Sequence, residues 1–235
     1  SSNYTFSTNN NGSLALDMNG NTVDMTTGTT VLLGPGLSGV ANSQMPMGFD
    51  FWLMGTRHTT FNVTTHGLIG LSTNMSTGNN IGGGTGARLG AFVNGTSAAN
   101  MATSATGKVH CKVIGTAPNR TLVVEWLNMS INNSSTNADA TFQVRLYETT
   151  NVVELMYGAM SITSGGPYTT VRAGFSTNTS ANTFQTVNLI THVTSALAGT
   201  DNTFSTGIMT TLNSVANGNR RYYRYVPNAT TAPTG

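Results

Sequence analysis

The fold of this 235-residue chain is decided by two stretches, KVHCKVIGTAPNRTLVVEW (Lys108–Trp126) and FQVRLYETTNVVELMYG (Phe142–Gly158). In each stretch, apolar residues alternate with other residues on both sides of a short polar break. Alternation with a period of two is typical of strands, and a short polar break between two such runs suits a hairpin turn. Both stretches are therefore predicted to be antiparallel β-hairpins.

The first hairpin places its turn at residues 116–119. Successive side chains of a strand point to opposite faces of a sheet, so cross-strand partners divide the hairpin into two faces. The face predicted to point inward carries the pairs Val109–Trp126, Cys111–Val124 and Val113–Leu122. The other face, predicted to point outward, has His110 opposite Glu125 and Lys112 opposite Val123.

The second hairpin places its turn at residues 148–151 and divides in the same way. Its predicted inward pairs are Phe142–Tyr157, Val144–Leu155 and Leu146–Val153. On the predicted outward face, Arg145 lies opposite Glu154. A shift of one residue would exchange the two faces of either hairpin, so both registers are strongly specified.

Further short alternating runs, separated by Gly, Asn and Pro, continue the pattern on both sides of the hairpins. Such a density of strands predicts an all-β sandwich or barrel, which we interpret as a single domain over residues 1–235. Residues 182–217 fit strands with long loops or a short helix, and residues 228–235 are expected to be a terminal tail. The additional predicted strands are Tyr4–Thr8, Ser13–Asp17, Thr22–Met25, Thr30–Leu33, Gly48–Met54, Thr59–Thr64, Leu68–Ser72, Arg88–Val93, Val171–Ser176 and Arg221–Val226.

The composition agrees with an all-β fold and excludes several function classes. Thr, Ser, Asn and Gly make up 115 of the 235 residues, while 38% are hydrophobic and 8% are charged. Thr favours strands, and Asn and Gly favour turns rather than helices. The net charge of +2 offers no basic patch for nucleic acid. No apolar run is long enough to span a membrane. Neither nucleic acid nor a membrane is therefore expected as a partner.

The two hairpins, together with residues 45–72, resemble a β-sandwich domain found in secreted surface proteins of Bacteroidetes. The earlier block reads MPMGFDFWLMGTRHTTFNVTTHGLIGLS (Met45–Ser72), with HGLI where the family has NGWL. The closing run RYYRYVP (Arg221–Pro227) is similar to the family's last strand. The resemblance implies an antiparallel, jelly-roll-like β-sandwich exported to the cell surface, often by type IX secretion. The chain begins at Ser1 without a signal peptide, which fits a mature exported chain or a trimmed one.

No catalytic, cofactor or metal-binding motif is found among the titratable residues. The eight carboxylates are scattered, and Glu125 and Glu154 are assigned to cross-strand pairs, so a pair of glycosidase carboxylates is not expected. The four histidines have no metal-ligand spacing. Cys111, on an inward face, is predicted to be a buried and unreactive thiol.

One weak calcium candidate is the segment DMNGNTVD, which offers alternating oxygen ligands at Asp17, Asn19, Asn21 and Asp24. The same segment also fits two strands joined by an Asn19-Gly20 turn. We favour the plain hairpin.

Two functions fit this sequence. The first is a non-enzymatic extracellular or cell-surface subunit that assembles with copies of itself into a filament or sheath. The second is a monomeric adhesion or glycan-binding module. An uncharged, hydroxyl-rich surface favours association in both cases. A glycan module would need exposed aromatic residues, and of the two Trp residues Trp126 is assigned inward while Trp52 keeps an open face.

The proposed assembly segment is the N-terminal strand, formed by Tyr4, Thr5, Phe6, Ser7 and Thr8. Tyr4 and Phe6 share one side, and residues 9–12 are predicted to break the strand. Such a strand can complete the sheet of a neighbouring copy, or it can pair within its own subunit. The sequence leaves both arrangements open.

Overall fold

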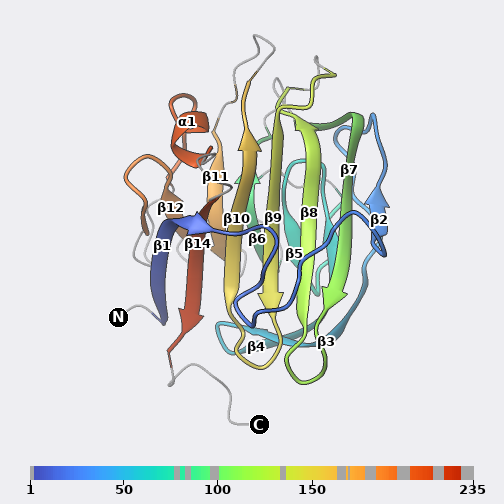
Figure 1. Ribbon diagram of the computed structural model, residues 1–235, viewed down its shortest axis with the longest axis vertical. Helices are drawn as coiled ribbons and strands as arrows, with labels where there is room; N and C mark the ends of the chain where they lie inside the picture. Colours follow the sequence, from blue (N-terminus) through green and yellow to red (C-terminus); the bar gives the residue numbers. More distant parts are fainter. Residues whose placement is uncertain are drawn as a thin grey trace.

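The computed structural model describes residues 3–76, 80–82, 86–95, 101–132, 136–162, 168, 170–177, 184–194, 202–213 and 220–228. Two antiparallel sheets of seven strands face one another in these residues (Figure 1). The prediction of an all-β antiparallel sandwich is confirmed. The predicted terminal tail lies outside the described residues, apart from Asn228.

The sheet nearer the viewer in Figure 1, here the front sheet, carries both hairpins. Its order is β1 (Tyr4–Gly12), β14 (Arg220–Pro227), β10 (Val153–Met160), β9 (Ala140–Tyr147), β8 (Thr121–Ser130), β7 (Ala102–Ile114) and β2 (Thr30–Leu33). The back sheet has the order β13 (Val193–Thr194), β12 (Phe184–Asn188), β11 (Arg172–Ser176), β6 (Ala87–Val93), β5 (Ile69–Leu71), β4 (Thr56–Val63) and β3 (Met45–Leu53). Residues 182–217, which the sequence left open, contain β12, β13 and the short helix α1 (Met209–Leu212).

Both hairpin registers are confirmed pair by pair. Eleven of the twelve residues predicted to face inward are buried, and the exception is Val113, which is 42% exposed. That part of the prediction is wrong because β2 pairs with β7 only as far as Cys111 in the described chain. At Val113, near the turn, β7 therefore has no strand on that side.

The core lies between the two sheets and is crossed by hydrogen bonds from aromatic side chains. The Trp126 ring is fully buried and stacks on Phe142 with 5.3 Å between ring centroids. Its Nε1–H donates to the Thr64 carbonyl of the facing sheet at 2.9 Å. The Tyr157 hydroxyl likewise donates to the Ala91 carbonyl. Each bond satisfies a polar group that burial would otherwise leave without a partner.

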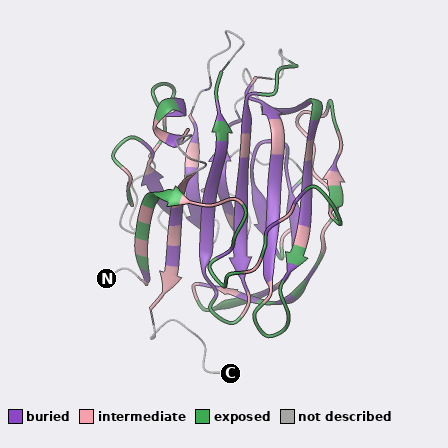
Figure 2. Cartoon of the chain, in the orientation of Figure 1, coloured by how far each residue is buried: buried purple, intermediate pink, exposed green. Residues whose placement is uncertain are grey.

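The predicted outward face of the hairpins is buried, which corrects the sequence analysis. The side chains of Arg145, Glu154 and His110 are inaccessible to solvent. Residues 13–29, here the crossing segment, connect β1 to β2 and run across this face of the front sheet (Figure 1). Figure 2 shows most residues of the strands beneath it as buried.

The crossing segment does not form the two strands predicted at Ser13–Asp17 and Thr22–Met25. One isolated bridge joins Leu16 to Thr22, and a turn lies between them. The carbonyls of residues 13, 14 and 16 accept hydrogen bonds from Arg145 instead of from a ladder partner. A side chain of the sheet thus satisfies backbone groups that a second strand would have used.

Candidate functional site

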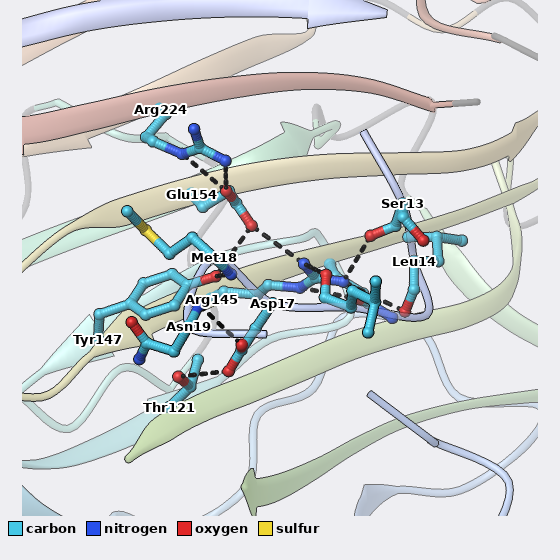
Figure 3. A network of polar contacts seen from close by, with 12 residues as sticks. Ser13, Leu14, Asp17, Met18, Asn19, Thr121, Arg145, Tyr147, Glu154 and Arg224 are labelled. Atoms are coloured by element: carbon cyan, nitrogen blue, oxygen red, sulfur yellow. Dashed lines mark hydrogen bonds and ion pairs between the residues drawn. The ribbon is translucent and has the colours of Figure 1, made fainter. Parts of the chain in front are cut away.

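A buried ionic network holds the crossing segment on the front sheet (Figure 3). Glu154 is its centre and accepts hydrogen bonds from three side chains. Its Oε1 accepts from Arg145 Nη1 and from the Tyr147 hydroxyl, both at 3.1 Å. Its Oε2 accepts from Arg224, with Nη2 at 2.6 Å and Nε at 2.9 Å. A buried carboxylate is tolerated because charged donors surround it.

Arg145 uses all of its donors within this network. A guanidinium has five N–H groups, and here they meet five acceptors. These acceptors are Glu154 Oε1, Gln143 Oε1 and the carbonyl oxygens of Ser13, Leu14 and Leu16. One side chain therefore neutralises a buried carboxylate and also fixes the start of the crossing segment.

Tyr147 and Asp17 fasten the next part of the segment. The Tyr147 hydroxyl accepts the Met18 N–H at 3.2 Å while it donates to Glu154. Burial, followed by the charge of Glu154, raises the pKa of Tyr147 well above its ordinary value. The Asp17 carboxylate accepts from the Thr121 hydroxyl of β8 at 3.1 Å. The segment is thus bound directly to two neighbouring strands of the front sheet, β8 and β9.

The residues of the calcium candidate do not converge on a cation. Asp17 Oδ1 accepts the N–H groups of Asn19 and Asn21 at 2.9 and 2.8 Å, and its Oδ2 accepts from the Asn21 amide at 3.1 Å. Asp24 accepts from Thr26 and Thr27 instead, and the hydrogen bond from Thr26 contributes most to its lowered pKa. These carboxylates face donors, which is the geometry of a hydrogen-bonded turn. Within the described ranges, no three His, Cys, Asp or Glu side chains are placed to hold a metal ion.

A hydroxyl, an imidazole and a carboxylate form a chain farther along the crossing segment. Thr29 Oγ1 lies 2.9 Å from His110 Nδ1, and His110 Nε2 lies 2.8 Å from Glu125 Oε1. Glu125 also accepts from the Gln143 amide at 2.6 Å. The imidazole is inaccessible, although Glu125 lines a cavity of about 520 Å³ beside it. The predicted pairing of His110 with Glu125 is confirmed, and its geometry secures Thr29 at the end of the segment.

An open pocket lies at the end of the sandwich where β3 meets the β9–β10 turn. Its volume is about 410 Å³, and it is lined by Phe49, Asp50 and Trp52 of β3, by Arg120, and by Glu148, Thr149 and Asn151 of the turn. Trp52 is half-buried, so the predicted open face of this ring is present. The pocket joins the two sheets, because the backbone N–H of Trp52 donates to Asn151 Oδ1 at 2.9 Å.

Two arginine–carboxylate pairs fix the charged groups near this pocket. Arg120 donates to Glu148 from Nε and Nη2, both at 2.7 Å, and from its backbone N–H at 3.0 Å. Arg57 donates to Asp50 at 2.7 and 2.9 Å. Hydrogen bonds from these arginines hold the pKa of Glu148 and that of Asp50 below their usual values. Sequence reasoning missed this pocket because its parts come from three separate segments.

The predicted assembly segment, Tyr4–Thr8, forms the greater part of β1. It pairs with β14 of its own chain, so the structure shows the arrangement within one subunit. Tyr4 is buried against Phe175 and Tyr225, and its hydroxyl accepts the Met54 N–H at 3.1 Å. The predicted break is replaced by a shift in register between Asn9 and Gly12, within the strand.

Comparison with known proteins places the chain by its family rather than by a close relative. A family model described as NIDO related matches residues 3–227. No curated protein and no solved structure matches the chain. Domains of this kind are typically extracellular, and α1, the one helix in the described residues, is far too short to cross a membrane. Because the match spans nearly the whole sequence, the chain belongs to the NIDO-related family.

Proposed function

We propose that this protein is a non-enzymatic, secreted structural subunit that assembles with copies of itself into an extracellular filament or sheath. The observation that carries the proposal is the outer edge of β1, the last strand of the front sheet, on which no strand of the described chain pairs. An edge strand presents backbone N–H and C=O groups on which another chain can pair. Addition of this kind, if head-to-tail, does not close on itself and produces a fibre.

Of the four sheet edges in the described chain, β1 is the one best suited to this role. It has nine residues, YTFSTNNNG, without charge or proline, and its first six pair regularly with β14. β2 has four residues and β13 has two, whereas β3 contains Pro46 and Asp50. Proteins commonly guard edges with shortness, charge and proline, and β1 has none of these protections.

The candidate chemistry of the other sites supports a non-enzymatic role. A glycosidase needs a carboxylic acid with a raised pKa, whereas Asp50 and Glu148 both have lowered values. The Thr29–His110–Glu125 chain has the order of a hydrolase triad, but its imidazole is inaccessible to a substrate. Both arrangements fit structural hydrogen bonds and ion pairs better than catalysis.

A second part of the proposal concerns how the protein is exported. The resemblance of residues 45–72, 115–126 and 142–158 to Bacteroidetes surface domains supports secretion to the cell surface by the type IX route. The alternative function is a monomeric cell-surface adhesion or glycan-binding module. The association state of the purified protein distinguishes the two functions.

Sedimentation velocity over a range of concentrations, followed by negative-stain microscopy, tests the proposal. We expect the wild-type protein to form filaments or sheets, and Thr5→Lys to raise the concentration needed by about tenfold, because a charge on an edge strand opposes pairing. Thr5 is exposed on β1. The control Asn119→Lys adds the same charge at an exposed turn residue and should assemble as the wild type does. A wild-type protein that stays monomeric at every concentration would overturn the proposal.

A further inference from the structure

We propose that the pocket between β3 and the β9–β10 turn binds a neutral saccharide, with Trp52 as the stacking platform. This site goes beyond the self-assembly proposed above and does not depend on it, since none of the residues that line the pocket belongs to β1. Either a filament subunit or a monomer can present it.

Trp52 provides the apolar contact that a sugar ring needs. It lies on β3 between Phe51, which is fully buried in the core, and Leu53, which is also buried. Alternation along the strand therefore turns Trp52 away from the core and into the pocket. A half-buried indole keeps part of its apolar surface accessible to a ligand while the rest is covered by the protein. Pyranose rings have C–H faces that stack on such a surface.

The polar groups of the pocket are suited to hydroxyls. The carboxylates of Asp50 and Glu148 accept hydrogen bonds, and the Thr149 hydroxyl, which donates to the Pro118 carbonyl at 2.6 Å, can accept one as well. Arg120 Nη1 makes no hydrogen bond to any residue that the structure describes, while its other guanidinium nitrogens bind Glu148. Donors and acceptors thus surround the aromatic platform, which matches the mixed hydrogen bonding of a sugar.

The charges at the pocket cancel in pairs, which selects against ionic ligands. Glu148 is neutralised by Arg120, and Asp50 is neutralised by Arg57. An anion would meet the carboxylates of Asp50 and Glu148, and a cation would meet the Arg120 guanidinium group and carboxylates already engaged by arginines. A neutral ligand rich in hydroxyls meets neither cost.

Contacts from both sheets hold the backbone and the polar groups of the pocket in place. Asn151 is buried. Its Oδ1 accepts a hydrogen bond from the backbone N–H of Trp52, and its Nδ2 donates to the Thr149 carbonyl at 3.1 Å. The Arg120 guanidinium lies over the Phe49 ring, with 5.7 Å to the ring centroid. Both sheets therefore hold the Trp52 backbone and the polar groups in fixed relation, which lowers the entropic cost of binding.

The test uses the full chain and four neutral hexasaccharides: cellohexaose, maltohexaose, mannohexaose and hexa-N-acetylchitohexaose, with hexagalacturonate as the charged comparison. We expect at least one neutral probe to bind, by saturation-transfer NMR, more tightly than hexagalacturonate. Trp52→Ala should weaken that binding by about tenfold or more, as loss of a stacking platform would. The control Ile190→Ala removes another exposed apolar side chain, 49% exposed, and should leave binding unchanged.

Intrinsic fluorescence gives a second measurement that needs no variant. Trp126 is fully buried in the core, so a saccharide-induced change in emission reports Trp52. Binding of no neutral hexasaccharide, tighter binding of hexagalacturonate, or binding unaffected by Trp52→Ala in a folded protein would each overturn the proposal. None of these outcomes bears on self-assembly, which sedimentation measures separately.

Discussion

At the scale of single residues, Arg145 shows how a buried charge can serve a fold with few charges. Its five donors are all used, and its side chain is 1% exposed beside an equally buried Glu154. Removing one partner of such a pair leaves the other charged and desolvated. Removing one partner of this buried pair should therefore cost much more unfolding free energy than removing one partner of an exposed pair with similar geometry.

We predict that Arg145→Met lowers the free energy of unfolding by about 3–5 kcal/mol, because Glu154 and three carbonyls of the crossing segment lose a donor. Urea unfolding followed by tryptophan fluorescence measures the change. The matched control is Arg57→Met, which breaks an ion pair whose side chains are 55% and 52% exposed. Arg57→Met should be nearly neutral, and equal effects of the two changes would contradict the interpretation.

Trp126 gives a second prediction at this scale. Trp126→Ala should cost about 3–5 kcal/mol of unfolding free energy, since it empties a large site in the core. Trp126→Phe keeps an aromatic ring against Phe142 but loses the bond to the Thr64 carbonyl. It should therefore cost less than the alanine change in the same urea titration. If Trp126→Ala left the free energy of unfolding unchanged, the two sheets would not pack as described.

Cys111 is predicted to be unreactive in the folded protein. Burial raises the pKa of its thiol from 9.0 to about 11. The folded state therefore holds this proton more tightly than the unfolded state, and its contribution to stability is lost as the pH rises from about 9 toward 11. Iodoacetamide at pH 8, followed by mass spectrometry, should label the protein in urea and not in buffer. Rapid labelling of the native protein would place Cys111 outside the core.

At the scale of elements, β1 combines a firm attachment with a free side. Tyr4 is buried between the sheets, and the strand pairs with β14 from Tyr4 to Asn9 without a shift. The other side of the strand pairs with no strand in the described chain. Assembly can therefore proceed by addition to this edge while β1 stays on its own subunit, or by exchange of β1 between subunits.

A disulfide at paired positions distinguishes these mechanisms. Thr5 and Val226 are Cα partners in β1 and β14, so Thr5→Cys with Val226→Cys should link the two strands when oxidised. If copies add to the edge, the oxidised protein still assembles and migrates as a monomer on a non-reducing gel. Covalent dimers or longer species on that gel would show exchange instead. The reduced double variant is the control.

At the scale of the whole molecule, the small net charge shapes association. Ten basic and eight acidic residues give a net charge of +2 over 235 residues, so long-range repulsion between copies is weak. Self-assembly should therefore depend little on NaCl between about 0.05 and 0.5 M, because salt screens a repulsion that is already small. Light scattering at fixed protein concentration measures this. A strong salt dependence would point to an ionic interface elsewhere on the surface.

The sequence by itself determined the local part of this fold. Alternation fixed the inward faces of both hairpins, and the polar breaks fixed their turns, because both are properties of neighbouring residues along a strand. The same reasoning placed His110 opposite Glu125 and Arg145 opposite Glu154. The face predicted to point outward also carries three largely apolar side chains, Val123, Tyr147 and Met156. Their presence was a signal that this face is covered as well, and all three are buried.

Only the tertiary structure decided what covers that face and where the candidate sites lie. The crossing segment reaches Arg145 from about 130 positions earlier in the chain, with the Leu16 carbonyl bound at 2.9 Å. The Trp52 pocket likewise gathers residues of β3, Arg120 and the β9–β10 turn. Neither contact repeats with a period or follows from a turn. Each contact depends on how two sheets and a connecting segment pack. Packing brings together residues that are far apart in the sequence and whose spacing follows no regular pattern.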